Sequence, residues 1–146
     1  MPAITRGINV IARCGNQFRG ELLKGLSLTA FQAPYILHVC ARPGLSQEDL
    51  ARELHVNPSN AARQLAALEE LGFVTRVTRP EDKRQLAVFP TQKAIDAAPA
   101  VREANERWNE YLTRGMTAAE TGALEALLER MRARAEAWDA GRGGQA

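Results

Sequence analysis

Apolar residues at both ends of the chain recur at the three- and four-residue steps of an α-helix. Over residues 4–23 they form one stripe, made of Ile4, Ile8, Ile11, Gly15, Phe18 and Leu22. Near the C-terminus a second stripe follows the capping-box pair Thr117 and Glu120, and it consists of Leu124, Leu128, Met131, Ala135 and Trp138. A further helix is predicted after a Thr91 cap, with Pro99 expected to kink or restart it. The chain is therefore predicted to begin and end with amphipathic helices.

The middle of the chain carries three shorter helical signals, each with residues suited to a helix start. The pairs are Thr29 with Gln32, Ser46 with Asp49, and Asn57 with Pro58. The helix after Pro58 has an inner stripe of Ala61, Leu65 and Leu68, and Gly72 is expected to end it. The pattern predicts a short helix, a tight turn and a second helix, which together form a helix-turn-helix unit.

Two alternating segments, residues 73–78 and 85–89, follow this unit and predict a two-stranded β-hairpin. The polar turn between them, residues 79–84, is rich in basic side chains. The fold class is therefore mainly α with a small β-hairpin.

The second helix of a helix-turn-helix unit enters the DNA major groove with its N-terminal residues first. Here those residues include Ser59, Asn60, Arg63 and Gln64, whose side chains can hydrogen-bond to base edges or phosphates. The hairpin adds the basic residues Arg76, Arg79, Lys83 and Arg84, which suit phosphates or a narrow minor groove. Each feature alone is equally typical of a solvated surface, so the prediction of DNA binding depends on their order along the chain.

Composition narrows the class of protein without identifying it. The chain has 146 residues, 45% hydrophobic and 25% charged, as expected for one globular domain. A formal charge of +2 does not by itself argue for nucleic acid. No apolar run is long enough to span a bilayer, and we expect neither a signal peptide nor membrane association, so the protein is predicted to be cytoplasmic.

Enzymatic and metal-binding classes receive little support. Nucleophile-elbow, P-loop and dinucleotide-binding glycine patterns are missing from the sequence, and we expect no catalysis and no cofactor. His38, Cys40 and His55 are the residues from which a zinc site could be imagined. His38 and Cys40 are two apart on a predicted helix and point in nearly opposite directions, so we expect no metal site.

Four motifs in this order resemble the MarR (multiple antibiotic resistance regulator) family. They are Leu28-Thr29-x-x-Gln32, Ser46-Gln47-Glu48-Asp49-Leu50-Ala51, Leu68-Glu69-x-Leu71-Gly72-Phe73-Val74 and Asp82-Lys83-Arg84. The resemblance covers nearly the whole chain. It implies a winged helix-turn-helix protein that forms a homodimer through its terminal helices and binds pseudo-palindromic double-stranded DNA. It further implies a repressor that small ligands or oxidants release from DNA.

The resemblance also assigns residues and boundaries. Ser59, Asn60 and Arg63 match base- and phosphate-facing positions, Arg84 matches the wing arginine of the minor groove, and Asp82 matches the acid that orients it. Residues 1–146 would form one domain of this type, with the winged helix-turn-helix at 28–90. Dimerisation helices would occupy 1–25 and 91–140, and residues 141–146 would form a flexible tail.

Three questions stay open at this point. Cys14, between Arg13 and Arg19, is either a thiol that senses oxidants or an inert residue beside the apolar stripe. A ligand pocket could be lined by Phe18, Tyr35, His38 and Trp108, although such residues are equally typical of a core. A winged-helix module that binds proteins and no DNA is the alternative function.

Overall fold

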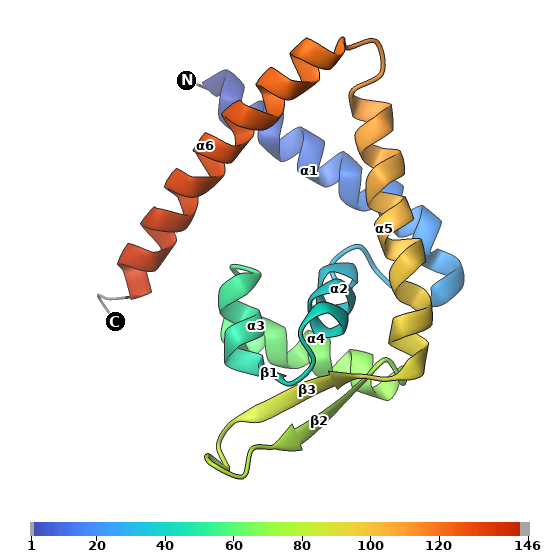
Figure 1. The fold of residues 1–146 in the computed structure, drawn as a ribbon, viewed down its shortest axis with the longest axis vertical. Coiled ribbons are helices and arrows are strands. Elements are labelled where there is room, and N and C mark those ends of the chain that lie inside the picture. Colours follow the sequence, from blue (N-terminus) through green and yellow to red (C-terminus); the bar gives the residue numbers. More distant parts are fainter. Residues whose placement is uncertain (1, 144–146) are drawn as a thin grey trace. The chain divides into compact units, whose positions relative to one another are not determined.

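The computed structural model describes residues 2–143, and most of them are helical (Figure 1). The elements are α1 (Pro2–Leu23), the 3-10 helix η1 (Lys24–Leu26), α2 (Ala33–Ala41), β1 (Leu45–Ser46), α3 (Gln47–Glu53), α4 (Pro58–Glu70), β2 (Val74–Thr78), β3 (Leu86–Pro90), α5 (Gln92–Leu112) and α6 (Ala118–Gly143). Two compact units divide within α5 after Trp108. The mainly helical fold class predicted from the sequence is confirmed.

The first unit contains the hydrophobic core, which lies among the end of α1, helices α2, α3 and α4, the sheet and the first part of α5. Ile36, Leu50, Leu65, Leu68 and Val88 are all completely buried in it. Burial of a leucine-sized side chain contributes about 1.5–3 kcal/mol, so this cluster is the main source of stability of the unit. The buried face of α4 is the stripe that the sequence predicted.

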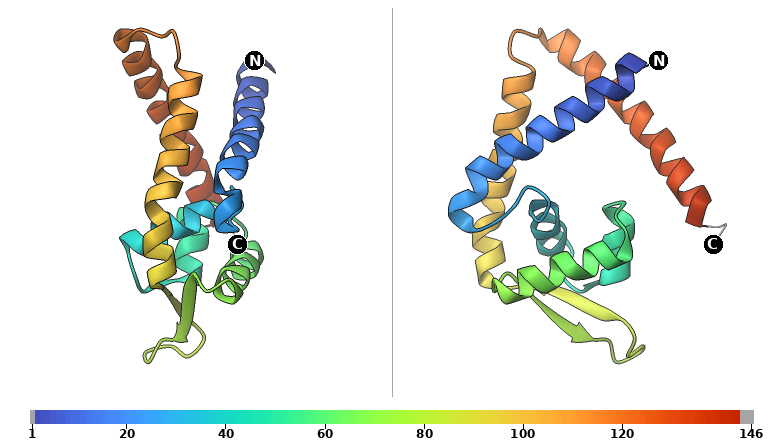
Figure 2. Two further views of the ribbon diagram at one scale, coloured as in Figure 1. Left: turned by 90° about the vertical axis from the view of Figure 1, so that its right-hand side faces the viewer. Right: turned by 180° about the vertical axis from the view of Figure 1, so that it is seen from behind.

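The sheet has three antiparallel strands in the order β1-β3-β2, where the sequence predicted a two-stranded hairpin. Strands β2 and β3 form that hairpin, and its tip points away from the helices of the first unit (Figure 2). The additional strand β1 pairs Leu45 with Val88 and Ser46 with Ala87. Two residues are too few to show an alternating pattern, which is why the prediction missed this strand.

The first half of α1 exposes its apolar stripe, whereas the second half packs against α5. Ile4, Ile8 and Ile11 are exposed, but Gly15 is buried against Trp108. A Cβ atom at Gly15 would lie 2.7 Å from Nε1 of Trp108, so only glycine fits there without displacement. The rings of Phe18 and Trp108 have centroids 5.2 Å apart.

Arg19 fixes the same contact between α1 and α5 by hydrogen bonds. Its guanidinium donates to the Gly15 carbonyl at 3.1 Å, to Asn16 Oδ1 at 2.9 Å and to Asn105 Oδ1 on α5 at 3.2 Å. Burial lowers the pKa of the Arg19 guanidinium, yet the group stays charged at neutral pH. The packed half of α1 therefore belongs to the first unit.

The start of α5 is joined to the end of α4 through side chains. Thr91 Oγ1 donates to the carbonyls of Gly72 at 2.6 Å and Phe73 at 3.0 Å. Lys93 Nζ donates to the Leu71 carbonyl at 2.6 Å and lies 4.5 Å from the centre of the Phe73 ring. The prediction that Thr91 caps α5 is corrected in part. The Thr91 carbonyl accepts the first helical hydrogen bond, from Ile95 N, but the Thr91 hydroxyl donates to the segment before the helix and does not cap it.

Two predictions about the C-terminal third are corrected in part: helix α5 does not restart at Pro99, and the first residues of the predicted tail are helical. Helix α5 runs through Pro99 without a break, because buried residues on both sides, Ala98 and Val101, hold the helix in place despite the lost backbone donor. The predicted tail at 141–146 is helical up to Gly143, where Arg142 lies over the Trp138 ring at 5.0 Å. Residues 144–146 lie outside the described part of the chain.

The second unit consists of the end of α5 and helix α6. The predicted capping box holds, since Glu120 N donates to Thr117 Oγ1 at 3.1 Å and Thr117 N to Glu120 Oε2 at 2.9 Å. The apolar residues of α6 are exposed, and they are Leu124, Leu127, Leu128, Met131 and Trp138. Within residues 2–143, every helix is too short or too polar to cross a membrane.

Candidate nucleic-acid interface

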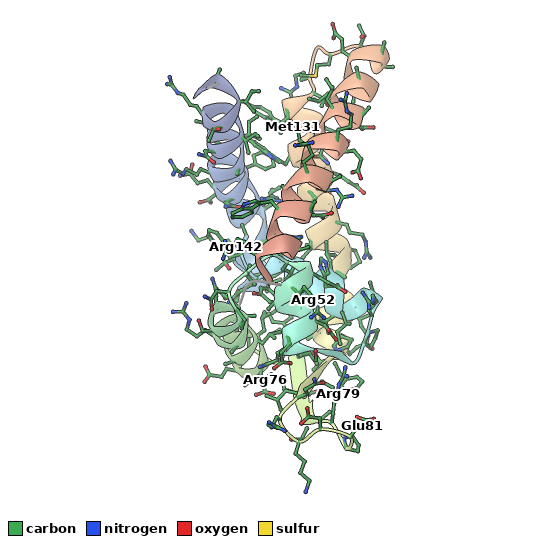
Figure 3. The ribbon with its side chains drawn as sticks, turned by 90° about the vertical axis from the view of Figure 1, so that its left-hand side faces the viewer. Arg52, Arg76, Arg79, Glu81, Met131 and Arg142 are labelled. Carbon is green, nitrogen blue, oxygen red and sulfur yellow. The ribbon has the colours of Figure 1, made fainter. Side chains whose placement is uncertain are left out.

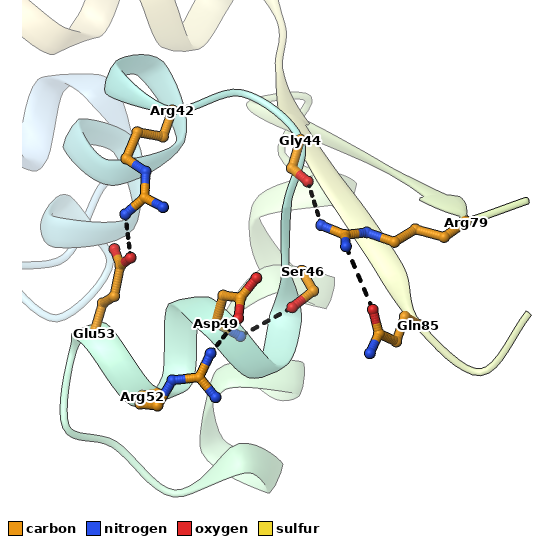
Figure 4. Close-up of polar contacts among 8 residues, drawn as sticks. All are labelled: Arg42, Gly44, Ser46, Asp49, Arg52, Glu53, Arg79 and Gln85. Carbon is orange, nitrogen blue, oxygen red and sulfur yellow. Dashed lines mark hydrogen bonds and ion pairs between the residues drawn. The ribbon is translucent and has the colours of Figure 1, made fainter. Parts of the chain in front are cut away.

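Helices α3 and α4 are each started by a side-chain cap. Ser46 Oγ accepts from Asp49 N at 3.0 Å before α3, in the polar cluster of Figure 4. Asn57 Oδ1 accepts from Ser59 N at 2.9 Å before α4, with Pro58 in the first turn. Between the two helices His55 adopts a left-handed φ of 54°, which reverses the chain tightly. The helix-turn-helix geometry predicted from the caps is present.

The four predicted contact residues of α4 lie outside its buried stripe, with Ser59 and Arg63 on the far side and Asn60 and Gln64 on the flank. Ser59 and Arg63 are exposed, and Asn60 and Gln64 are half-buried. The hydroxyl hydrogen of Ser59 is already used within the protein, because it is donated to Asn57 Oδ1 at 2.6 Å. This side of α4 therefore presents hydroxyl, amide and guanidinium groups to a ligand outside the protein.

The hairpin tip carries two exposed cations and one acid that orients a cation. The Arg84 side chain is 95% exposed, and its Nε lies 3.7 Å from Asp82 Oδ1. Asp82 Oδ1 also accepts from Arg84 N at 3.0 Å, which holds the turn in one conformation. Lys83 is exposed beside them. The structure thus places Asp82 against Arg84, where the family resemblance had assigned it.

The other two predicted hairpin cations point inward. Arg76 donates to Gln47 Oε1 at 2.8 Å and to Glu69 Oε1 at 3.2 Å. Arg79 donates to the Gly44 carbonyl at 2.8 Å and to Gln85 Oε1 at 3.5 Å (Figure 4). Figure 3 shows both arginines on the hairpin and Glu81 in its turn. The eight predicted contact residues therefore divide into an outward set and these two.

Three residues that the sequence analysis did not assign to the interface complete this arrangement, namely Gly44, Gln47 and Glu69. The hydrogen bond from the Arg76 guanidinium lowers the pKa of the Glu69 carboxyl, which stays ionised at neutral pH. Gln47 is 29 positions from Arg76 in sequence. No local spacing connects residues that far apart, so only the fold reveals the contact.

The remaining candidate residues are placed as follows. Cys14 is exposed on α1 in the single chain. Tyr35 is buried, and its hydroxyl has no hydrogen-bond partner among residues 2–143. His38 Nδ1 lies 2.9 Å from the Pro34 carbonyl, and Phe18 contacts Trp108 as described above. In the described part of the chain His, Cys, Asp and Glu do not gather into any group of three able to hold a metal ion.

Burial also shifts the pKa of two groups on α2, the Tyr35 hydroxyl and the Cys40 thiol. It raises the pKa of the Tyr35 hydroxyl, which therefore stays protonated at neutral pH. It raises the pKa of the Cys40 thiol as well, although Arg102 acts in the opposite direction. Cys40 is partly buried and packs against the hydrophobic core, and a raised pKa disfavours its thiolate form.

Comparison with known proteins agrees with this geometry. A model of the MarR family matches residues 24–85. The HTH-type transcriptional regulator YybA of Bacillus subtilis is 33% identical over 90% of this chain and 88% of its own length. A crystal structure of the transcriptional regulator SlyA is 32% identical, with a TM-score of 0.87 over 93% of this chain and 96% of that one.

A DNA complex is among the similar structures. A MarR family transcriptional regulator from Listeria monocytogenes, solved with a 26mer DNA, is 27% identical with a TM-score of 0.84. The similarity covers 92% of this chain and 90% of the Listeria chain.

Proposed function

This chain belongs to the MarR family of DNA-binding transcriptional regulators, and on that premise we propose that it represses transcription as a homodimer on a pseudo-palindromic operator. The observation that carries the proposal is the polar side of α4 beside a hairpin tipped with exposed cations. Helix α4 is the element that would enter the major groove. Lys83 and Arg84 would reach the backbone or the neighbouring minor groove. The DNA-bound Listeria relative supports this mode of action.

Different contacts are proposed for the two outward arginines. Arg63 lies on the exposed side of α4, where it would read a guanine or hold a phosphate. Arg84, oriented by Asp82, would enter a narrow minor groove. Ser59, Asn60 and Gln64 would add hydrogen bonds to base edges or phosphates.

Homodimerisation is proposed from the apolar side chains that the terminal helices leave exposed. Ile4, Ile8 and Ile11 on α1, together with Leu127 and Leu128 on α6, are each 44–54% exposed. Exposed apolar groups gathered on one element are typical of an association surface. A two-fold dimer would present two copies of α4 to half-sites one helical turn apart.

Release from DNA by an effector is the finer part of the proposal, and two features support it. The Tyr35 hydroxyl is buried and unpartnered among residues 2–143, as suits a site that receives a polar ligand group. Cys14 is exposed on α1 and open to oxidants. If Cys14 is the sensor, mild peroxide weakens DNA binding by wild type and leaves Cys14→Ser unaffected. We place this regulation in the cytoplasm.

The test is selection of bound fragments from the DNA of the organism, followed by titrations of specific and scrambled duplexes at several salt concentrations. Arg84→Ala should weaken binding to both duplexes by about 1–2 kcal/mol and reduce the salt slope by about one. Arg63→Ala should cost about 1–3 kcal/mol and, if it reads a base, relax the preference at one position per half-site. Unchanged binding in both variants would overturn these contact assignments, whereas the absence of salt-dependent DNA retention by the wild type would favour the alternative function, a module that binds proteins and no DNA.

A further inference from the structure

The side chain of Arg76 connects three elements of the candidate interface. From β2 it reaches Gln47, the first residue of α3, at 2.8 Å, and Glu69 in the last turn of α4 at 3.2 Å. Arg76 N donates in addition to Glu69 Oε2 at 3.0 Å, so one carboxylate holds both the main chain and the side chain. We call the trio of Arg76, Gln47 and Glu69 the wing brace.

The guanidinium of Arg76 is not presented to solvent. Its side chain is 19% exposed, against 95% for Arg84 at the hairpin tip. Its Nε has no hydrogen-bond partner among residues 2–143. An arginine Nε pairs readily with a phosphate, but this Nε is buried, so a phosphate in solvent cannot reach it. A phosphate would have to displace Glu69 to bind this group.

Arg79 holds the hairpin at a second point. It lies just beyond β2 and donates to the Gly44 carbonyl, in the loop before β1, at 2.8 Å. Its main chain also closes the hairpin, because Arg79 N donates to the Gln85 carbonyl at 3.0 Å. The hairpin is thereby fixed to α3 and α4 at one point and to the preceding loop at another.

We propose that Arg76, with Gln47 and Glu69, is a positioning residue that sets the hairpin against the recognition helix, and that it does not contact DNA. The sequence had grouped Arg76 with the DNA-contacting cations. A groove-reading helix and a minor-groove arginine must bind the same duplex at a fixed separation. The wing brace sets that separation, and Arg79 supports it. This inference rests on the proposed function, since its consequence is expressed on DNA.

Titrations of a selected duplex at several salt concentrations separate positioning from direct contact. Arg76→Met should weaken binding roughly tenfold and leave the salt slope unchanged, because no phosphate contact is removed. Arg84→Ala is the comparison, with a slope lower by about one. Arg76→Lys keeps the charge but cannot bridge two acceptors in a fork, so it should not restore affinity.

Glu69→Gln gives opposite signs for the two interpretations. If the wing brace positions the hairpin, losing this carboxylate weakens DNA binding by a few-fold. If Glu69 is only an acid near the phosphates, neutralising it strengthens binding. Glu70→Gln is the matched control on the same turn and should bind at least as tightly as wild type. Stronger binding by Glu69→Gln, or a slope lowered by about one in Arg76→Met, overturns the proposal.

A readout without DNA keeps this inference separate from the proposed function. In a double-mutant cycle of Arg76→Met and Glu69→Gln, urea unfolding should show a coupling of at least about twofold in the unfolding equilibrium constant. Additive effects overturn the wing brace whether or not the protein binds DNA. Coupling in a protein that retains no DNA supports the brace and removes only the proposed function.

Discussion

The winged-helix part of the first unit buries its large apolar residues, whereas the terminal helices leave many of theirs exposed. Leu65 on α4 is completely buried, whereas Leu127 on α6 is 54% exposed and Trp138 65% exposed. The winged-helix part therefore completes its core within one chain. The terminal helices have the same kind of side chains without a cover for them, and their burial requires another surface. The comparison teaches that one chain divides its apolar residues between folding and association.

The largest effect is expected from removing the C-terminal helix. A chain that ends at Tyr111 loses all of α6 and should be a monomer or an aggregate, because the exposed face of α1 alone buries too little surface. Sedimentation velocity measures the outcome against the full chain. A truncated protein that stays soluble and fully dimeric would falsify this assignment of the association surface.

Two leucine substitutions sharpen the comparison by separating folding from association. Leu65→Ala removes a fully buried side chain and should lower the free energy of unfolding by about 2–5 kcal/mol. Leu127→Ala should change that free energy by much less and should chiefly weaken the dimer. Urea unfolding and sedimentation equilibrium measure the two quantities. The comparison breaks if Leu127→Ala costs as much in folding and leaves association unchanged.

Helix α1 has an exposed half and a packed half, and alanine substitutions at two of its glycines test whether Gly15 marks the close contact with α5. Gly15→Ala should destabilise the fold by about 1–3 kcal/mol, since its Cβ would meet Trp108 at 2.7 Å. Gly20→Ala, on the same helix with open space around it, should stabilise by about 0.5–1 kcal/mol. Thermal unfolding of both variants gives the sign of each change in stability. Equal shifts of the unfolding temperature would contradict the close contact between Gly15 and Trp108.

The smallest effect concerns the pH dependence of the winged-helix part. The hydrogen bond from Arg76 lowers the pKa of Glu69, so its stabilising contribution is present above the ordinary glutamate pKa of about 4.3. The contribution is lost as pH falls through the lower, folded value. The Glu69 side chain is 40% exposed, so we expect less than about 1 kcal/mol. The gap in urea stability between wild type and Glu69→Gln should shrink from pH 6 to pH 3, and a constant gap would contradict the linkage.

Features that depend on near neighbours could be predicted from the sequence. Thr29 Oγ1 accepts from Gln32 N, and Gln32 Oε1 accepts from Thr29 N, both at 3.1 Å, as the spacing indicates. These bonds lie in the turn before α2, so the helix begins at Ala33 and not at Thr29 as predicted. The buried stripe of α4 follows from helical periodicity for the same reason. These features need no knowledge of tertiary contacts.

Features that depend on distant partners could not be predicted. Strand β1 exists because Leu45 meets Val88, and the inward turn of Arg76 depends on Gln47. The sequence does not show whether a basic side chain in a hairpin faces solvent or pairs with a carboxylate. For that reason the sequence identified the candidate interface as a region but could not separate Arg76 and Arg79 from Arg84.

Hydrogen bonds join the start of α5 to the segment that follows α4, and this joint links the proposed DNA-binding and dimerisation elements. Thr91 and Lys93 at the start of α5 donate to carbonyls of residues 71–73, which follow directly on α4. An event that displaced the start of α5 while these hydrogen bonds stayed intact would also displace the end of α4. By thermodynamic reciprocity, whatever factor such an event applies to DNA affinity, DNA applies to that event in return. On the proposed function, operator DNA would then be an effector of the helices that are proposed to join two copies of the chain.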